Sequence, residues 1–76
     1  MPPLPTLRGR KLVAVLERLG WSIARQQGSH IIMTKPGNIA TLAIPAHKEV
    51  AKGPLRTLIR GAGLTVQEFL TTYDAG

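Results

Sequence analysis

Three short runs of strand-forming residues, separated by two tight-turn signals, occupy the middle of this chain. Alternation with a period of two and a high content of β-branched residues are typical of strands. Gly adopts positive φ and Ser, Pro and Asn favour tight turns, so the breaks are short connections. The runs are 21–27, 31–35 and 39–44, and the breaks between them are Gly28-Ser29 and Pro36-Gly37-Asn38. Short turns join antiparallel neighbours, so the pattern predicts a three-stranded meander that Pro45 stops.

An amphipathic helix is predicted ahead of these strands. Its apolar positions recur at spacings of three, four and seven residues and are Leu12, Val15, Leu16 and Leu19. Thr6 is the expected N-cap, and Gly20 ends the helix. Gly9 lies in its first turn, where a glycine weakens helical structure. Residues 1–5 are interpreted as a flexible, proline-rich leader.

Two more helices are predicted after a polar connection over residues 46–53. Pro54 suits the start of the first, whose apolar stripe consists of Leu55, Leu58 and Ile59. Gly61 and Gly63 mark its end. Thr65-Val66-Gln67-Glu68 has the Thr-x-x-Glu form of a capping box, which predicts a short final helix.

The resulting order is α-β-β-β-α with a short terminal helix, in one domain over residues 1–76. We therefore expect an α+β fold in which a three-stranded antiparallel sheet carries its helices on one face and leaves the other face open.

Composition narrows the classes of function. Ten Lys and Arg against four Asp and Glu give a net charge of +6, which favours a polyanionic partner: nucleic acid first, an acidic protein second. The chain has no Cys, so disulfides and zinc-thiolate sites are excluded. Two His without a carboxylate cluster make a poor metal site, and phosphate-binding glycine loops are absent. We expect no metal or cofactor.

No apolar run is long enough to span a membrane, and no signal-peptide pattern is present. A protein without membrane contact is therefore expected, and the lack of Cys suits a reducing cytoplasm.

His30 is the candidate catalytic residue. It follows the Gly28-Ser29 turn and opens the second predicted strand, where the ladder fixes the direction of a side chain. An imidazole gains or loses a proton near neutral pH, as general acid or base catalysis requires. If Ile31 and Met33 face the helices, His30 lies on the open face; the opposite register, with an inward Ile32, remains possible. An edge residue without a role is the alternative interpretation of His30.

RNA suits a histidine in a basic setting. Its 2′-OH can attack the adjacent phosphate when a base takes the proton and cations stabilise the phosphoryl oxygens, without a metal ion. The cations expected nearest to the strand face are Arg25, Lys35, Lys48 and Lys52. His47 is a candidate for a second proton-transfer group. A non-catalytic domain that binds RNA through charge and shape fits the same residues.

Several motifs, taken as a set, resemble the HicA family of toxins from prokaryotic toxin–antitoxin pairs. The resemblance runs from about Gly9 to Leu70. It rests on Gly28-Ser29-His30 before an apolar strand, Ile44-Pro45-Ala46-His47-Lys48, Lys52-Gly53 before Leu55, and Gly63-Leu64-Thr65 before Glu68-Phe69-Leu70.

This resemblance implies a fold similar to a double-stranded RNA-binding domain and ribonuclease activity on messenger RNA, which halts translation and growth. The catalytic histidine of the family falls on His30, and RNA contacts are expected around Gly28 and Ser29. The resemblance also implies an antitoxin, HicB, that blocks the toxin and through which the complex contacts DNA.

Two features depart from the family pattern. Pro54 occupies a position that is commonly Thr, which removes a hydroxyl and an N–H from the start of a helix and weakens any phosphate contact there. The proline-rich leader has no counterpart.

Overall fold

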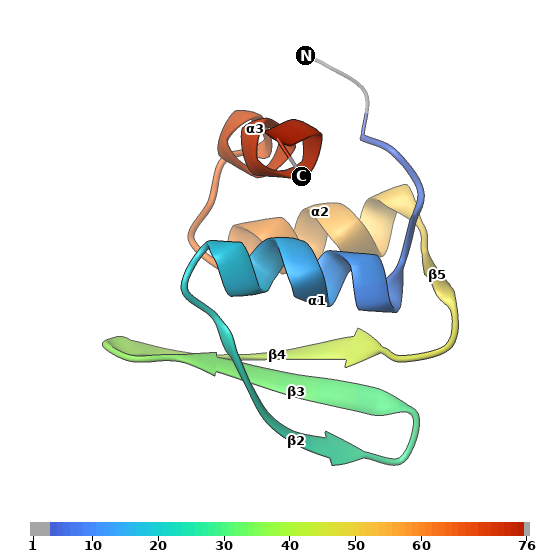
Figure 1. Cartoon of the computed structure of the whole chain (residues 1–76), viewed down its shortest axis with the longest axis vertical. Helices are drawn as coiled ribbons and strands as arrows, with labels where there is room; N and C mark the ends of the chain where they lie inside the picture. Colours follow the sequence, from blue (N-terminus) through green and yellow to red (C-terminus); the bar gives the residue numbers. More distant parts are fainter. Residues whose placement is uncertain (1–3, 76) are drawn as a thin grey trace.

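The computed structural model describes residues 4–75, and two sheets and three helices make up this part of the chain. The elements are β1 (Leu7–Arg8), α1 (Gly9–Arg18), β2 (Ser22–Gln27), β3 (His30–Lys35), β4 (Asn38–Pro45), β5 (Glu49–Val50), α2 (Lys52–Gly61) and α3 (Val66–Ala75). The main sheet has the order β2-β3-β4 and is antiparallel. Figure 1 shows α1 and α2 on one side of this sheet, with α3 beyond them. The predicted α+β class and the α-β-β-β-α order are confirmed, and they are compatible with a fold like that of a double-stranded RNA-binding domain.

Two tight turns connect the strands of the main sheet, whose register shifts once in each pair, between Ile23 and Arg25 and between Met33 and Lys35. Gly28 has φ +57° at the first central position of the turn between Gln27 and His30, which pair, as in a type II′ hairpin. Gly37 has φ +81° and follows Pro36, as in a type II turn. Ile39, the second residue of β4 after this turn, has a fully exposed side chain.

The register places His30 on the open face of the sheet. Ile31 and Met33 belong to the hydrophobic core, whereas Ile32 is buried outside that cluster. Side chains alternate along a strand, so His30 and Ile32 share the face turned away from the helices. The interpretation in which Ile32 points inward is therefore wrong.

The core lies between the helices and the inner face of the sheet. α1 contributes the predicted stripe, although Leu19 is only partly buried. The largest fully buried side chains include Trp21, Phe69, Leu12, Leu16, Met33, Ile44, Leu55 and Ile59. The core is thus mainly aliphatic, and both helices over the sheet present one apolar face to it.

The segment before α1 differs from the prediction. Thr6 is exposed and does not cap the helix; Arg8 is the N-cap residue, without a capping side-chain bond. Leu7 pairs instead with Val50, and both are buried. Leu4 is also buried in the core, although it falls within the predicted flexible leader; residues 1–3 lie outside the described part of the chain. Burial of these apolar side chains outweighs the local capping preference.

The connection after β4 also differs from the prediction, because it contains β5. The helix that follows begins at Lys52, so Pro54 occupies its third position. This position is still within the first turn, where a missing N–H costs no helical hydrogen bond.

The C-terminal ends of α1 and α2 and the start of α3 agree with the sequence. Gly20 and Gly63 have φ +96° and +76°, as expected just beyond α1 and α2. The capping box of α3 is formed: the Thr65 N–H donates to Glu68 Oε1 at 2.9 Å, and the Glu68 N–H donates to Thr65 Oγ1 at 3.0 Å.

Candidate active site

A hollow of about 280 Å³ lies at the end of the sheet where the β2–β3 turn meets the segment after β4. Its lining residues are Ser29, His30, Pro45, His47 and Lys48. His30 pairs with Pro45 across the two strands, and the Ala46 N–H donates to the Ser29 carbonyl at 2.7 Å. These contacts hold both predicted histidines and one predicted lysine around one space.

Both imidazoles are exposed at this hollow. None of the side-chain hydrogen bonds within residues 4–75 involves His30 or His47. The two rings can therefore turn their nitrogen atoms towards a ligand without breaking any of these hydrogen bonds.

Gly9, the first residue of α1, packs against the backbone of two residues that line the hollow, Pro45 and Lys48. The Gly9 N–H donates to the Lys48 carbonyl at 3.0 Å, and Gly9 is buried against the backbone of Pro45. A Cβ on Gly9 would lie 2.8 Å from the Pro45 carbonyl carbon and closer still to its oxygen. Only a glycine lets α1 and the end of β4 approach this closely.

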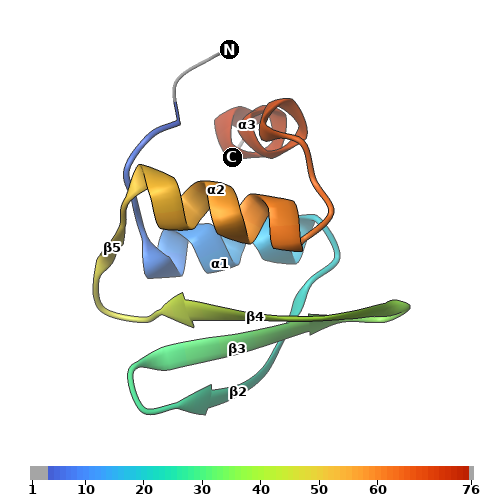
Figure 2. The same cartoon turned by 180° about the vertical axis from the view of Figure 1, so that it is seen from behind.

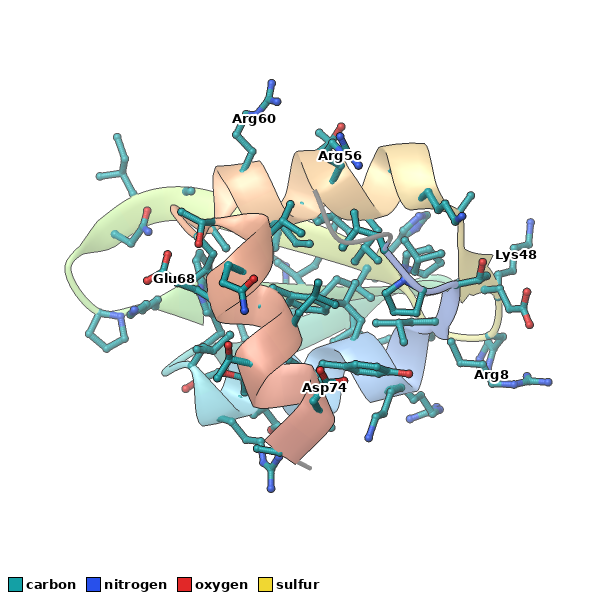
Figure 3. All side chains as sticks on the ribbon, turned by 90° about the horizontal axis from the view of Figure 1, so that it is seen from above. Arg8, Lys48, Arg56, Arg60, Glu68 and Asp74 are labelled. Atoms are coloured by element: carbon teal, nitrogen blue, oxygen red, sulfur yellow. The ribbon has the colours of Figure 1, made fainter. Side chains whose placement is uncertain are left out.

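Positive charge gathers at the same end of the fold. Figures 1 and 2 show that α1 and α2 both begin here, close to β5. Neither helix has an acidic residue in its first turn or a side-chain cap, so the N–H groups at both ends favour an anion. Figure 3 shows Arg8 and Lys48 at this end. The cations in the chain segments that meet here are Arg8, Arg10, Lys11, Lys48 and Lys52, against the single acid Glu49.

Most of the remaining candidates lie close to this end. Gly28 belongs to the turn that precedes Ser29, and Lys52 opens α2. Arg25 lies opposite Ile32 on the open face of the sheet. Lys35 does not join them, because it pairs with Asn38 at the far end of the hairpin, where its side chain runs beside Gly20.

Sequence reasoning missed two residues of the site. Pro45 is predicted as a strand terminator and belongs to the Ile44–Lys48 motif, and its place in the wall of the hollow, as the strand partner of His30, is not predicted. Gly9 was interpreted only as a weak helix former. Counting outward from the Pro36–Gly37 turn pairs His30 with Ala43 and misses Pro45, because the register shifts between Met33 and Lys35. No local signal marks the close approach of Gly9.

The described residues 4–75 contain neither a cluster of metal ligands nor a membrane-spanning helix. No three His, Asp or Glu side chains lie together there as ligands for a metal ion. No helix in this range is long and apolar enough to cross a membrane.

Fold and site together define a small, strongly basic α+β domain with an open sheet face and two exposed histidines at one end of it. A family model described as the HicA toxin of bacterial toxin–antitoxin systems matches residues 9–64, about three quarters of the chain. The chain therefore belongs to the HicA toxin family. Membership gives it the role of a toxin and implies a cognate antitoxin as partner. No curated protein matches the chain.

Proposed function

We propose that this toxin is an endoribonuclease that cleaves messenger RNA without a metal ion, with His30 as its catalytic residue. The observation that carries the proposal is the hollow in which His30, His47 and Lys48 meet. A general base, a second proton-transfer group and a cation are what RNA transesterification needs. Loss of messenger RNA would stop translation and growth, and the activity belongs in the cytoplasm, where messenger RNA is translated.

The chemistry can be written for these residues. The neutral imidazole of His30 takes the proton of a ribose 2′-OH, and the 2′-oxygen forms a bond to the adjacent phosphorus. The bond from phosphorus to the 5′-oxygen breaks, and His47 protonates that leaving oxygen. Lys48 stabilises the charge on the phosphoryl oxygens. The products are a 2′,3′-cyclic phosphate and a 5′-hydroxyl end.

The surroundings of the hollow would hold the substrate. Lys52 and Arg25 supply positive charge on two sides, and the turn formed by Gly28 and Ser29 offers backbone groups to the RNA. Pro54 cannot donate an N–H, so α2 would contribute through Lys52 and Gly53 rather than through its third residue.

The partner in this proposal is an antitoxin similar to HicB that blocks the toxin. DNA would be contacted only through that antitoxin. The excess of positive charge on this chain suits an acidic antitoxin surface.

The test is cleavage of a synthetic RNA by wild type, His30→Ala and His47→Ala, with the fold of each variant checked by circular dichroism. We expect no cleavage by His30→Ala and a loss of about 10²–10⁴-fold for His47→Ala, the usual contribution of one proton-transfer group. Cleavage should continue in the presence of a chelator. Equal cleavage by wild type and a folded His30→Ala would overturn the proposal.

A matched substrate isolates the chemistry. One 2′-deoxynucleotide at the cleaved position removes the nucleophile and leaves the phosphate contacts unchanged. We expect this RNA to bind and to remain intact. Its hydrolysis at the same bond would exclude attack by the 2′-OH.

A non-catalytic RNA-binding domain is the second candidate function. It is favoured by the imidazole of His30, which no hydrogen bond within residues 4–75 orients, whereas catalytic bases are commonly held by a partner. Induction of wild type and His30→Ala in a bacterial host separates the two functions. Growth arrest with loss of message only for wild type supports the nuclease, and equal arrest by both without loss of message supports binding alone.

A further inference from the structure

We infer that three cations along α2 form a track for the RNA backbone, which continues from the histidine hollow along the helix. The inference rests on the proposed function, because it concerns the RNA that would enter the hollow. The track consists of Lys52, Arg56 and Arg60, which we call the α2 row. It would bind nucleotides that flank the cleaved bond rather than the bond itself.

The spacing of the α2 row is regular. Its members are four residues apart, so they succeed each other at about 6 Å along the helix axis, with a drift of about 40° around it. All three are exposed, and α2 contains no acidic residue. The row begins one short strand after Lys48, which lines the hollow. A chain of phosphates that leaves the hollow on this side would therefore meet one cation after another.

Two of the three cations of α1, Lys11 and Arg18, contact α3. Lys11 lies over the ring of Tyr73 at 5.6 Å, and an Arg18 guanidinium nitrogen donates to the Thr72 carbonyl at 3.4 Å. α3 thus engages cations of α1. Figure 3 shows Arg60 projecting away from α2, and Arg56 is exposed on the same helix. No side-chain hydrogen bond among residues 4–75 involves either of them.

A second hollow, beside Arg56 and Arg60, indicates that the α2 row can contact the sugar or base of a nucleotide as well as its phosphate. Arg56 and Arg60 border a space of about 200 Å³ over Ile59, Leu64 and Val66, where the chain turns from α2 to α3. A ribose or a base can cover this apolar floor while the neighbouring phosphates contact the two guanidinium groups. An acidic protein segment would also fit the floor. Continuity with the histidine hollow and regular spacing favour a polymer with repeated charges, which is RNA.

The test measures binding of a single-stranded RNA by full-length His30→Ala, which keeps the RNA intact. Arg60→Gln is compared with Arg18→Gln in this background. Both changes remove one charge from the last turn of a ten-residue helix, so net charge and helix-end effects are matched. We expect Arg60→Gln to weaken binding by about tenfold and to lower the slope of log K against log salt concentration by about 0.7, as the loss of one phosphate contact does. Arg18→Gln should change neither quantity by a comparable amount.

Substrate length provides the second measurement, with His30 restored. Arg56→Gln/Arg60→Gln should lower kcat/KM on a long RNA and leave it unchanged on a dinucleoside monophosphate, which cannot reach the track. The track would be overturned if the salt slope in the His30→Ala background were the same with and without Arg60→Gln. It would also be overturned if Arg56→Gln/Arg60→Gln lowered kcat/KM equally on the long RNA and on the dinucleoside monophosphate. If Arg60→Gln abolished antitoxin binding and left RNA binding unchanged, the track would also be overturned, because the surface would then belong to the protein partner. Failure of the nuclease proposal would appear differently, as binding without cleavage at any length.

Discussion

Replacement of Gly9 by Ala tests the link between α1 and the histidine hollow. The new Cβ would lie 2.8 Å from the Pro45 carbonyl carbon and well inside van der Waals contact with its oxygen. Both atoms belong to the backbone, so no side-chain rotation relieves the overlap. The start of α1 and the end of β4 must separate, which also stretches the 3.0 Å hydrogen bond from Gly9 to Lys48.

The size of the effect follows from these contacts. Overpacking costs about 1–3 kcal/mol, and loss of a buried hydrogen bond adds about 1–3 kcal/mol. The higher helix propensity of Ala returns up to about 1 kcal/mol. These contributions leave a net loss of about 1–6 kcal/mol. A loss of about 3 kcal/mol, near the middle of this range, would lower Tm by about 12–24 °C in a domain of this size. RNA cleavage should fall as well, because Pro45 and Lys48 move.

Gly53→Ala is the matched control, because Gly53 also lies in the first turn of a ten-residue helix but has no atom within 4 Å of its Cβ position. This change should leave Tm unchanged or raise it slightly, by the equivalent of about 0.5 kcal/mol. The assay is thermal unfolding of both variants and wild type, followed by circular dichroism. Equal Tm values for Gly9→Ala and Gly53→Ala would refute the close-approach argument.

Three further outcomes are expected from stability measurements. Leu4→Ala should cost about 2 kcal/mol in denaturant unfolding because Leu4 is buried in the core, and a loss under 0.5 kcal/mol would show that it contributes little. Thr65→Ala should cost about 1 kcal/mol by removing the cap of α3, with faster amide exchange in that helix as the check. Hydrogen bonds from the backbone N–H and the hydroxyl of Thr65 lower the pKa of Glu68 below 4.5. The stabilisation is thus present above that pH and lost as the pH falls through the lowered pKa, and Glu68→Gln should flatten this acid limb of the unfolding curve.

The parts of the fold that could be predicted from the sequence depend on local signals. The apolar stripe from Leu12 to Leu19 and the Thr65–Glu68 capping box act within one or two turns of helix. Gly28 and Gly37 specify turns that bring neighbouring strands together. The same local chemistry placed His30 directly behind a turn, which is why its exposure on the open face could be anticipated.

What the sequence missed depends on residues that are far apart in the chain. Leu7 pairs with Val50, and no property of either short segment identifies the other. The nearness of Gly9 to Pro45 likewise exists only once α1 lies against the sheet. Lys35 shows the opposite error: its charge is correct for RNA, but the length of the β3–β4 hairpin carries it away from the hollow.

The exposed hairpin tip provides a position for spectroscopic labels. The chain has no cysteine, so Ile39→Cys would carry the single thiol of the molecule. The side chain of Ile39 contacts no part of the core, and its turn lies at the end of β3 and β4 opposite to His30 and Pro45. A fluorophore or a surface tether attached there would report on the binding of RNA or of an antitoxin without covering the histidine hollow.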